Sequence, residues 1–358
     1  MTVFGGAFKG CKVLMTGHTG FKGSWLALWL QQLGAEVVGL ALPPEMQPNH
    51  WDLLKLDIEA HHVDIRDYAA VQKVVSKVDP EIVFHLAAQP LVRRSYGDPL
   101  TTWATNVQGT AHLLEACRHV ANLRAIVAVT TDKCYENQGW LWGYRENDRL
   151  GGYDPYSASK AGAELVAASY RQSYFASENS PLLATARAGN VIGGGDWSAD
   201  RLIPDLVRAR ARGESVEIRS PHATRPWQHV LESLSGYLLL GQRLLERQTS
   251  FAEAWNFGPN ESGNQPVSAV LSKLTQNWGE LQWHVTGAPQ PHEAALLQLD
   301  SAKARTLLKW LPVWELEEGL RQTANWYRAY VEKGEVISLQ QLTDYLSAAQ
   351  AKKLGWAI

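Results

Sequence analysis

Short apolar runs alternate with segments of helical spacing along the first half of the chain. The runs are rich in Val, Ile, Leu and Ala, and each precedes a segment of helical period or a signal that starts a helix. Strands are predicted at residues 12–16, 36–41, 61–65, 81–86, 125–131 and 182–187. This alternation indicates parallel strands joined by right-handed crossovers, and therefore an α/β fold with an open, doubly wound parallel sheet. Ligands bind such sheets at the carboxyl ends of the strands.

The pattern changes after Arg187. Residues 188–197 are rich in glycine and polar side chains, which is typical of a loop and marks a change of lobe. Helices are expected at residues 202–212, 228–246, 267–276, 301–309 and 316–332, and short strands at 216–218 and 254–257. Because no Ser/Pro-rich linker separates the halves, we expect two interleaved lobes. The sheet domain would comprise residues 1–187, with residues from about 220 to 260 returning to it, and residues 188–358 would mainly form a smaller second lobe.

Composition narrows the classes of function. The chain has 358 residues, of which 45% are hydrophobic and 20% charged, and its formal net charge is −2. A chain without clustered Lys and Arg offers no field for a nucleic acid, so no such partner is expected. The scattered Cys11, Cys117 and Cys134 suit neither a disulfide framework nor a metal cluster, so we expect no metal and a reducing compartment. Neither a leader nor a long apolar stretch is apparent, which predicts a cytoplasmic, soluble protein without membrane attachment.

Residues 16–23 read TGHTGFKG and directly follow an apolar run. The three glycines, Gly17, Gly20 and Gly23, let the backbone turn sharply and approach a pyrophosphate closely. The helix that follows supplies free N–H groups and the positive end of a dipole. The run therefore predicts a Rossmann-type dinucleotide site, and the alternative is an ordinary glycine-rich turn.

Tyr156 and Lys160 form a second candidate site, four residues apart and just after Asp154 and Pro155. Proline suits the first turn of a helix, so both side chains are expected on one helix face. An ammonium beside a phenol lowers the pKa of the phenol, which makes the pair a device for proton transfer near neutral pH. The alternative is a coincidental surface pair.

Polar groups also end the predicted strand at 125–131. Thr131, Asp132 and Lys133 place a hydroxyl, a carboxyl and an amine at the edge of the sheet where ligands bind. Thr131 next to Tyr156 would give a second hydrogen-bond donor to a substrate oxygen that is being oxidised. For Asp132 and Lys133 the alternative is a polar turn after a strand. Three tryptophans beside polar loop sequence are candidates to line a pocket: Trp103, Trp140 and Trp142.

In this order, and over nearly the whole chain, the motifs resemble those of the extended short-chain dehydrogenase/reductases that act on nucleotide sugars. The resemblance implies a Rossmann-type fold with a smaller, interleaved C-terminal substrate-binding lobe, and NAD as the cofactor. It also implies a homodimer or a dimer of dimers, with residues 100–120 and 155–174 as candidate contact helices. The matching positions are the glycines of TGxxGxxG, Asp64 and Ile65, HLAAQ at 85–89, Asn106, Thr131, Tyr156 and Lys160, Asn190, RLIP at 201–204 and RPW at 225–227.

Within that family, Thr131, Asp132 and Lys133 are similar to the strand end of the 4,6-dehydratases, because 4-epimerases usually lack the acidic residue. Together with GHTGFKG at 17–23 and GGGDW at 193–197, the triplet is most similar to the branch that acts on CDP-glucose. The branches that act on dTDP-glucose and GDP-mannose normally carry glutamate at the position of Lys133. They remain alternatives, followed by a nucleotide-sugar 4-epimerase and by a non-catalytic NAD-sensing binding protein. The CDP-glucose branch implies a role in deoxysugar biosynthesis, such as that of O-antigen lipopolysaccharide.

The resemblance also implies catalytic roles. Tyr156, ionised with help from Lys160 and the nicotinamide, would take the proton of the sugar 4-hydroxyl as hydride leaves carbon 4, and Thr131 would hold that oxygen. Asp132 would protonate the leaving 6-hydroxyl. Lys133 would either remove the carbon 5 proton as a neutral amine or, while charged, orient the substrate or stabilise an enolate.

Further residues are implied as ligand contacts. Asp64 would accept a hydrogen bond from the adenine amine, and guanidinium groups suit the substrate diphosphate. The second predicted strand lacks the usual acidic residue for the adenosine ribose, and Lys22 adds a positive charge, so the residues alone leave NADP open. The implied cofactor contacts are Gly17, His18, Thr19, Gly20, Phe21, Lys22, Gly23, Asp64, Ile65, Leu86, Ala87, Ala88, Gln89, Asn106, Tyr156 and Lys160. The implied substrate contacts are Asn190, Arg201, Arg225 and His292, with Glu293 beside it, whereas Arg93, Arg94 and Arg208 are equally well surface charges.

Overall fold

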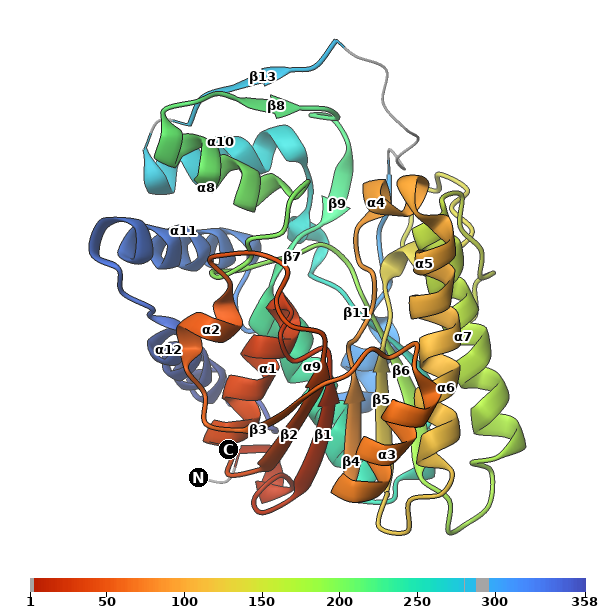
Figure 1. The fold of residues 1–358 in the computed structure, drawn as a ribbon. Coiled ribbons are helices and arrows are strands. Elements are labelled where there is room, and N and C mark those ends of the chain that lie inside the picture. The colour runs from red at the N-terminus through yellow and green to blue at the C-terminus, as the bar shows by residue number, and fades with distance from the viewer. Residues whose placement is uncertain (1–2, 280, 288–295) are drawn as a thin grey trace.

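A seven-stranded parallel sheet forms the centre of the computed structural model, which describes residues 3–279, 281–287 and 296–358 (Figure 1). Its strand order is β11-β6-β5-β4-β1-β2-β3, and every neighbouring pair is parallel. The predicted doubly wound α/β sheet is confirmed. The strands are β1 (Lys12–Thr16), β2 (Glu36–Ala41), β3 (Glu59–His62), β4 (Ile82–His85), β5 (Ala125–Val129), β6 (Leu182–Ala188) and β11 (Ala254–Phe257).

One predicted strand was misplaced. The apolar residues Val63 and Ile65 predicted a strand over 61–65, but β3 ends at His62. Ile65 is buried instead against Gly109, where even one extra carbon would lie 2.6 Å from the isoleucine side chain. A strand at the edge of a sheet has one neighbour, so its own residues need not be apolar, and the apolar pattern here belongs to the segment that follows it.

Alternate residues of the strands face two separate cores. Val13 and Met15 of β1 pack into the core beside α1 (Phe21–Gln32) and α9 (Val230–Leu245). Leu14 faces the opposite core. The two-residue period of a strand places neighbouring side chains on opposite faces, so both faces of the sheet are covered. On the second face lie α3 (Tyr68–Val78), α6 (Gly109–Cys117) and α7 (Pro155–Ser173).

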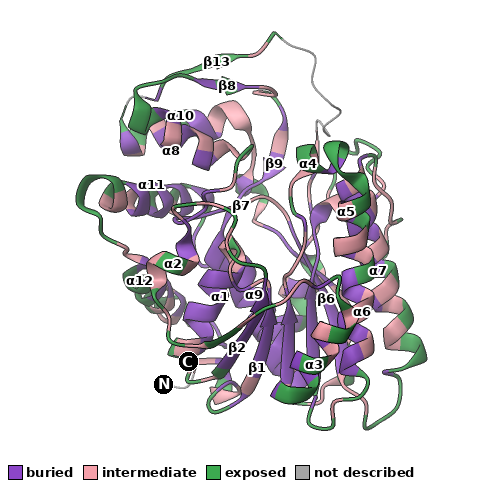
Figure 2. Ribbon diagram, in the orientation of Figure 1, coloured by how far each residue is buried: buried purple, intermediate pink, exposed green. Residues whose placement is uncertain are grey.

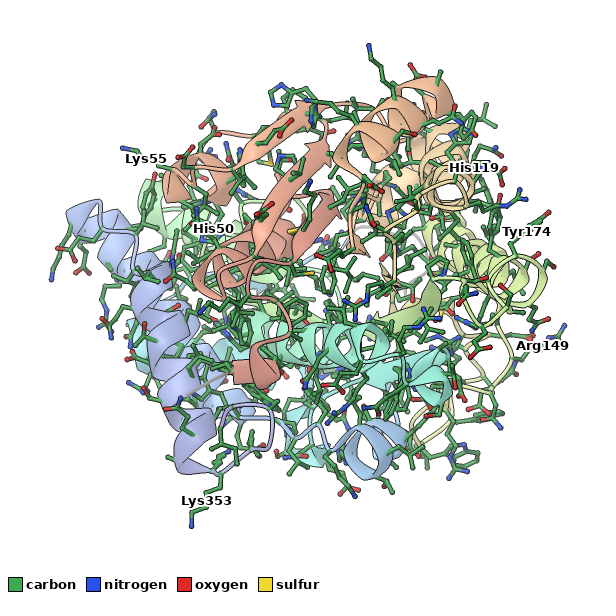
Figure 3. All side chains as sticks on the ribbon, turned by 90° about the horizontal axis from the view of Figure 1, so that it is seen from below. His50, Lys55, His119, Arg149, Tyr174 and Lys353 are labelled. Carbon is green, nitrogen blue, oxygen red and sulfur yellow. The ribbon has the colours of Figure 1, made fainter. Side chains whose placement is uncertain are left out.

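The later part of the chain builds a smaller layer above the carboxyl ends of the strands (Figure 1). Figure 2 shows the central strands buried, whereas the helices α4 (Val92–Gly97), α5 (Pro99–Trp103) and α7 present exposed residues. Seen from below, Lys55, Arg149 and Lys353 extend outward at the periphery (Figure 3). The elements of this layer are β7 (Val191–Ile192), α8 (Leu202–Arg212), β8 (Val216–Ile218), β9 (Thr224–Pro226), β10 (Gln228–His229), β12 (Asn264–Pro266), α10 (Val267–Trp278) and β13 (Trp283–Val285).

The remaining elements complete the surface and the rim. The helices predicted at 202–212, 228–246, 267–276 and 316–332 are present with their ends within two residues of the predictions, and 301–309 contains a short helical segment. One long helix, α12, was not predicted. The remaining segments are η1 (Val3–Gly6), α2 (His50–Leu54), α4 (Val92–Gly97), α5 (Pro99–Trp103), η2 (Ala104–Gln108), η3 (Asp132–Cys134), η4 (Thr249–Phe251), η5 (Glu261–Gly263), η6 (Ala304–Leu308), α11 (Leu316–Lys333) and α12 (Ser338–Ala351).

Candidate active site

One large cavity, about 1180 Å³ in volume, lies at the carboxyl ends of the strands and below the smaller layer. Cavities for a single small molecule usually measure roughly 300–1,000 Å³, so this one suits two ligands or one extended ligand. Most of the residues predicted from the sequence line it: Gly17, Thr19, Gly20, Phe21, Lys22, Gly23, Asp64, Ile65, Leu86, Ala87, Ala88, Gln89, Thr131, Asp132, Lys133, Tyr156, Lys160, Asn190, Arg201 and Arg225.

Two predicted contacts among the described residues do not line the cavity. His18 and Asn106 are buried behind the cavity wall, and His292 lies outside the described residues, as does Glu293. The ring of His18 packs edge-on against Trp51, and burial lowers its pKa to about 4. A side chain at Gly39 would collide with that ring at 2.5 Å, so a glycine in β2 makes room for this histidine.

The glycine turn requires glycine for steric reasons. Gly17 has a φ of 74°, and a Cβ there would lie 2.7 Å from the backbone nitrogen of Ala87. A Cβ at Gly23 would lie 2.0 Å from the carbonyl oxygen of Gly17. The N-cap of α1, Gly20, makes no side-chain cap, so the first N–H groups of the helix stay open toward the cavity. The predicted diphosphate turn therefore has the geometry that a dinucleotide needs.

A hydrogen-bonded relay fixes the strand ends beneath this turn. Thr16 Oγ1 accepts from the backbone N–H groups of residues 86 and 87, each at 3.1 Å, so its own proton goes to His85 Nδ1 at 2.7 Å. The opposite ring nitrogen of His85 therefore carries the proton and donates to Thr110 Oγ1 at 3.0 Å. Burial lowers the pKa of His85 to about 3, which keeps this tautomer neutral.

Asn106 supports the cavity wall from behind. Its side-chain oxygen accepts from Gln89 N at 2.8 Å, and its amide donates to Gln89 O at 3.1 Å and to Ser159 Oγ at 2.9 Å. Thr105, its neighbour in η2, lines the cavity instead. Asn106 thus ties the β4 loop to the helix that carries Tyr156 and Lys160, and sequence reasoning misplaced it as a direct contact.

Asp64 lines the cavity as predicted, but it already has a partner. Arg66 Nε and Nη2 both donate to its carboxylate, and the Nη2–Oδ2 distance is 2.5 Å. This hydrogen bonding holds the pKa of Asp64 below its usual range, so the group is an acceptor at neutral pH.

The catalytic candidates come from two adjoining elements, the end of β5 and the start of α7. Asp154 caps α7 by accepting from Ser157 N at 2.9 Å, and Pro155 occupies the first turn. Tyr156 N donates to Ser95 Oγ in α4 at 3.1 Å, which fixes where the phenol projects. Lys160 lies one turn further and donates to Val129 O of β5 at 3.1 Å.

Burial dominates the electrostatics of the Tyr156–Lys160 pair. It lowers the pKa of the Lys160 ammonium to about 8, although Glu164 acts in the opposite direction. It also raises the pKa of the Tyr156 phenol to about 12, against a hydrogen bond from Thr131. Tyr156 is expected to ionise with help from Lys160 and the nicotinamide charge, whereas in the protein alone burial is the largest influence on its pKa and raises it.

Asp132 has the environment of a proton donor. Its Oδ1 accepts from Thr131 Oγ1 at 3.0 Å, while the buried Oδ2 has no hydrogen-bond partner within the described part of the chain. Burial raises the pKa of its carboxyl group, which favours the protonated form. Lys133 is the next residue in the sequence and is half-buried. Its backbone N–H donates a hydrogen bond to Thr131 Oγ1 at 3.3 Å.

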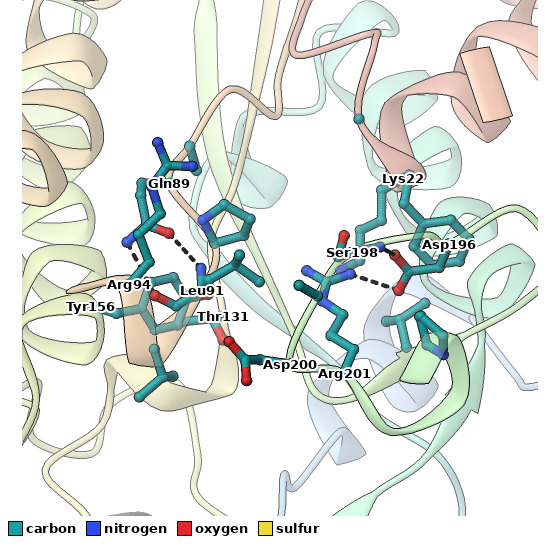
Figure 4. A pocket seen from close by; sticks show the side chains of 18 of the residues that line it. Lys22, Gln89, Leu91, Arg94, Thr131, Tyr156, Asp196, Ser198, Asp200 and Arg201 are labelled. Atoms are coloured by element: carbon teal, nitrogen blue, oxygen red, sulfur yellow. Dashed lines mark hydrogen bonds and ion pairs between the residues drawn. The ribbon is translucent and has the colours of Figure 1, made fainter. Parts of the chain in front are cut away.

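Two cations face the same end of the cavity from the opposite side. Lys22 Nζ donates to Tyr237 Oη at 3.2 Å, and burial lowers the pKa of this ammonium to about 7. Arg201 Nη1 pairs with Asp196 at 2.9 Å. Figure 4 shows Lys22, Arg201 and Asp196 on one side of the cavity, with Thr131 and Tyr156 across from them and Asp200 between the two groups.

A set of charges lies at the cavity mouth, of which the sequence singled out Arg93 and Arg94 but not their partners Glu45, Asp200 and Arg219. Arg93 in α4 pairs with Asp200 at 2.8 Å, and Arg219 reaches the same carboxylate at 3.8 Å. Arg94 pairs with Glu45 at 2.7 Å. All five residues line the cavity. No local signal identifies them, because each pair joins segments far apart in the sequence.

Other candidates do not reach the cavity. Arg208 pairs with Asp205 and donates to Trp197 O at 2.7 Å. The rings of Trp140 and Trp142 stack on each other, with their centroids 5.3 Å apart. Neither of these residues lines the cavity, and Trp103 does not line it either. Across the described residues, no group of three His, Cys, Asp or Glu side chains is placed to hold a metal ion. None of the helices in the described ranges is long and apolar enough to cross a membrane.

Comparison with protein families matches residues 14–323 to the family described as GDP-mannose 4,6 dehydratase. The chain belongs to this family. Membership of the extended short-chain dehydrogenase/reductases, predicted from the motifs, is thereby confirmed.

Individual relatives agree with this assignment. The chain is 48% identical over 351 residues to the CDP-glucose 4,6-dehydratase of Salmonella typhimurium, covering 95% of this chain and 98% of that protein. It is 27% identical to a dTDP-glucose 4,6-dehydratase of Xanthomonas campestris pv. campestris, over 88% of this chain and 92% of that protein.

Solved structures show the same fold. DesIV, a dTDP-glucose 4,6-dehydratase from Streptomyces venezuelae solved with NAD and TYD, matches with a TM-score of 0.75 and 25% identity, over 88% of this chain and 96% of that chain. The NAD complex of Thermus thermophilus UDP-glucose 4-epimerase also has a TM-score of 0.75 and 25% identity, covering 88% and 98%.

Proposed function

We propose that this protein is a CDP-D-glucose 4,6-dehydratase, a hydro-lyase that converts CDP-glucose to CDP-4-keto-6-deoxyglucose and water. The observation that carries the proposal is the meeting of Asp132 and Lys133 with Tyr156 and Lys160 in one cavity. An epimerase needs the tyrosine and lysine alone, whereas loss of water also needs an acid aimed at the 6-hydroxyl. The 48% identity to a CDP-glucose 4,6-dehydratase over nearly the full length supports the same reading.

NAD is the proposed cofactor. Gly17 and Gly23 leave space that any Cβ would fill, and the open N-terminus of α1 suits the diphosphate. Asp64 and Ile65 would hold the adenosine end, and the wall from Leu86 to Gln89 would follow the ribose and phosphates. When bound, NAD would accept the hydride of carbon 4 and return it to carbon 6, and its positive nicotinamide would favour the phenolate of Tyr156.

The oxidation at carbon 4 rests on Tyr156. Its phenolate takes the proton of the 4-hydroxyl, while Thr131 Oγ1 donates a hydrogen bond to the same oxygen. Lys160, held against Val129 O, keeps a positive charge beside the phenolate without itself touching the sugar. A proton transfer of this kind contributes a rate factor on the order of 10²–10⁴.

Elimination rests on Asp132 and Lys133. A ketone at carbon 4 acidifies the proton on carbon 5, so that the bond from carbon 6 to its hydroxyl can break once that oxygen is protonated. The buried carboxyl of Asp132 gives this proton and water leaves. Lys133 either removes the carbon 5 proton and returns it to carbon 5 as the hydride adds to carbon 6, or it stabilises the enolate while a solvent water takes up that proton and gives one back.

The substrate contacts are assigned to the layer above the strands. Arg225 is buried and lines the cavity, and Arg201 lines it as well. Their guanidinium groups would hold the diphosphate, with Asn190 contacting the sugar. His292 remains a prediction because it lies outside the described residues.

We assign residues 1–187 to an NAD-binding domain, with residues of about 220–260 returning to it, and residues 188–358 mainly to the nucleotide-sugar lobe. The return of β11 to the sheet supports this division. We also propose a homodimer or dimer of dimers, supported by exposed Leu100, Trp103 and Leu165 on α5 and α7. A cytoplasmic location is supported by three buried, unpaired cysteines. A role in O-antigen deoxysugar biosynthesis stays a prediction.

The decisive experiment offers the purified protein, with NAD, four substrates in parallel: CDP-glucose, dTDP-glucose, UDP-glucose and GDP-mannose. We expect a 4-keto-6-deoxy product, detected by its absorbance in alkali, with the highest kcat/KM for CDP-glucose. A preference for dTDP-glucose or GDP-mannose would assign the protein to another branch. Epimerised sugar without a keto product would overturn the dehydratase assignment.

A further inference from the structure

A buried carboxylate lies one helical turn beyond Lys160. Glu164, in α7, is 3% exposed and does not line the cavity. One of its oxygens accepts from Thr130 Oγ1, and the other accepts from Thr185 Oγ1 and from Arg187 Nη2, both at 2.8 Å. Thr130 is the residue between the Lys160 anchor at Val129 and the catalytic candidate Thr131. Glu164 thus connects the helix that carries Tyr156 to the strand end that carries Thr131.

The partner of Glu164 makes further hydrogen bonds through its Nη1, although its buried Nε has no hydrogen-bond partner within the described part of the chain. Arg187, also 3% exposed, donates through Nη1 to Tyr135 Oη at 2.8 Å and to the carbonyl of Glu146 at 3.0 Å. Burying an ion pair costs the desolvation of both charged groups, and this cost can exceed the attraction between them. A contribution to the stability of the fold therefore does not by itself explain why the pair is present. Its place directly behind the reacting groups calls for another explanation.

We propose that Glu164 is a positioning residue for the dehydratase reaction, whose buried negative charge keeps Lys160 protonated and holds the end of β5 against α7. This inference rests on the proposed function, because it assigns Lys160 the task of stabilising the Tyr156 phenolate. Side chains four apart in a helix are neighbours, with roughly 5–6 Å between their Cβ atoms, so the carboxylate is within effective electrostatic range.

The charges around Lys160 support this role. Burial acts to raise the pKa of Glu164, but Arg187 and the hydrogen bonds outweigh it and hold that pKa below its usual range. Glu164 is therefore ionised at neutral pH. Desolvation lowers the pKa of Lys160, and Glu164 is the largest of the influences that raise it.

The other titratable groups facing Lys160 do not take over this task. They are Lys22 from α1, His85 from β4, Asp132 and Cys134 from η3, Tyr156 from α7 itself and, beyond Glu164, Arg187 from β6. His85 and Cys134 are neutral at pH 7, since burial lowers the pKa of the first and raises that of the second. Lys22 repels the Lys160 charge, and burial raises the pKa of Asp132.

The test is the pH profile of kcat for Glu164→Gln with saturating CDP-glucose and NAD. Without the carboxylate, Lys160 loses its proton more easily, so the alkaline limit of activity should move down by about one pH unit. The acid limit should move up, because Tyr156 ionises less readily beside a less charged lysine. KM for CDP-glucose should stay within about twofold, since Glu164 does not line the cavity.

Thr185→Val is the matched control. It removes one hydrogen bond to the same carboxylate but leaves its charge, so both pH limits should stay where they are in the parent protein. If Glu164→Gln does not fold, Glu164→Gln with Arg187→Met removes the unpaired buried arginine as well, and the alkaline limit should still move down, by less than in the single variant.

Unchanged pH limits in a folded variant lacking the carboxylate would overturn the inference, as would a change in KM with kcat intact. Equal shifts for Thr185→Val would also overturn it, because they would assign the effect to packing. A failure of the proposed function looks different: the parent protein itself would then form no 4-keto-6-deoxy product from any nucleotide sugar.

Discussion

Two parts of the cavity lining are built in contrasting ways. The catalytic wall, which we define as Thr131, Asp132, Tyr156 and Lys160, is less than a tenth exposed at every position and anchored by backbone hydrogen bonds. The outer wall, defined as Arg93, Arg94, Asp200 and Arg219, consists of ion pairs at the mouth. In its Arg93–Asp200 pair both side chains are more than two-fifths exposed.

The difference separates two tasks. Proton transfer needs groups whose pKa and position are fixed, and burial supplies both on the catalytic wall. Recognition of an anion needs cations that can change partners, and exposed ion pairs contribute only about 0.2–1 kcal/mol each, so a ligand can displace them. The carboxylate of Asp200 pairs with Arg93 and Arg219 in the way that a phosphate group of a ligand would. Substitutions on the two walls should therefore differ both in size and in sign.

The largest effect is expected on the catalytic wall from Tyr156→Phe. Removing the phenolic oxygen deletes the base, so kcat should fall by about 10²–10⁴-fold while NAD still binds with its normal affinity. Steady-state product formation and a direct NAD titration measure the two quantities. Normal turnover would remove Tyr156 from the mechanism and the contrast between the walls with it.

A smaller effect is expected from Asp132→Asn, which should interrupt the reaction at a later point. The amide cannot protonate the 6-hydroxyl, so oxidation at carbon 4 should continue while formation of the 4-keto-6-deoxy product falls by at least about 10²-fold. Quenching with borodeuteride should place deuterium at carbon 4 of a sugar that keeps its 6-hydroxyl. Product at the parental yield would show that another group supplies the proton.

The smallest effect, and one of opposite sign, is expected on the outer wall from Asp200→Asn. Loss of this carboxylate frees Arg93 and Arg219, so KM for CDP-glucose should fall by about two- to fivefold with kcat unchanged. Glu214→Gln is the matched control, because Glu214 pairs with Arg212 away from the cavity and should leave KM as it is. A rise in KM for Asp200→Asn would instead make Asp200 a ligand contact.

Local patterns predicted the sheet and most of the catalytic wall. The apolar runs of β1, β2, β5 and β6 reflect strands buried on both faces, and the spacing of Tyr156 and Lys160 is a helical repeat. The helix α12 was missed although Leu342, Tyr345 and Ala349 mark its buried face, so a usable signal was present there.

The rest depends on contacts that no short stretch of sequence encodes. Lys22 was placed on the phosphate turn, but its direction is set by Tyr237, which lies 215 positions away in the chain. The Arg93–Asp200 pair spans 107 positions. The pKa of Tyr156 lies above the ordinary value of a phenol because of burial, which follows from the whole fold and not from the residues next to Tyr156 in the sequence.

The central claim is that one hydride leaves carbon 4 and returns to carbon 6 of the same sugar while water is lost. CDP-glucose labelled with deuterium at carbon 4, turned over in ordinary water with the purified protein and NAD, tests it most directly. We expect a product whose carbon 6 methyl group carries the deuterium. A keto product without deuterium at carbon 6, or a labelled epimer that retains its 6-hydroxyl, would contradict it.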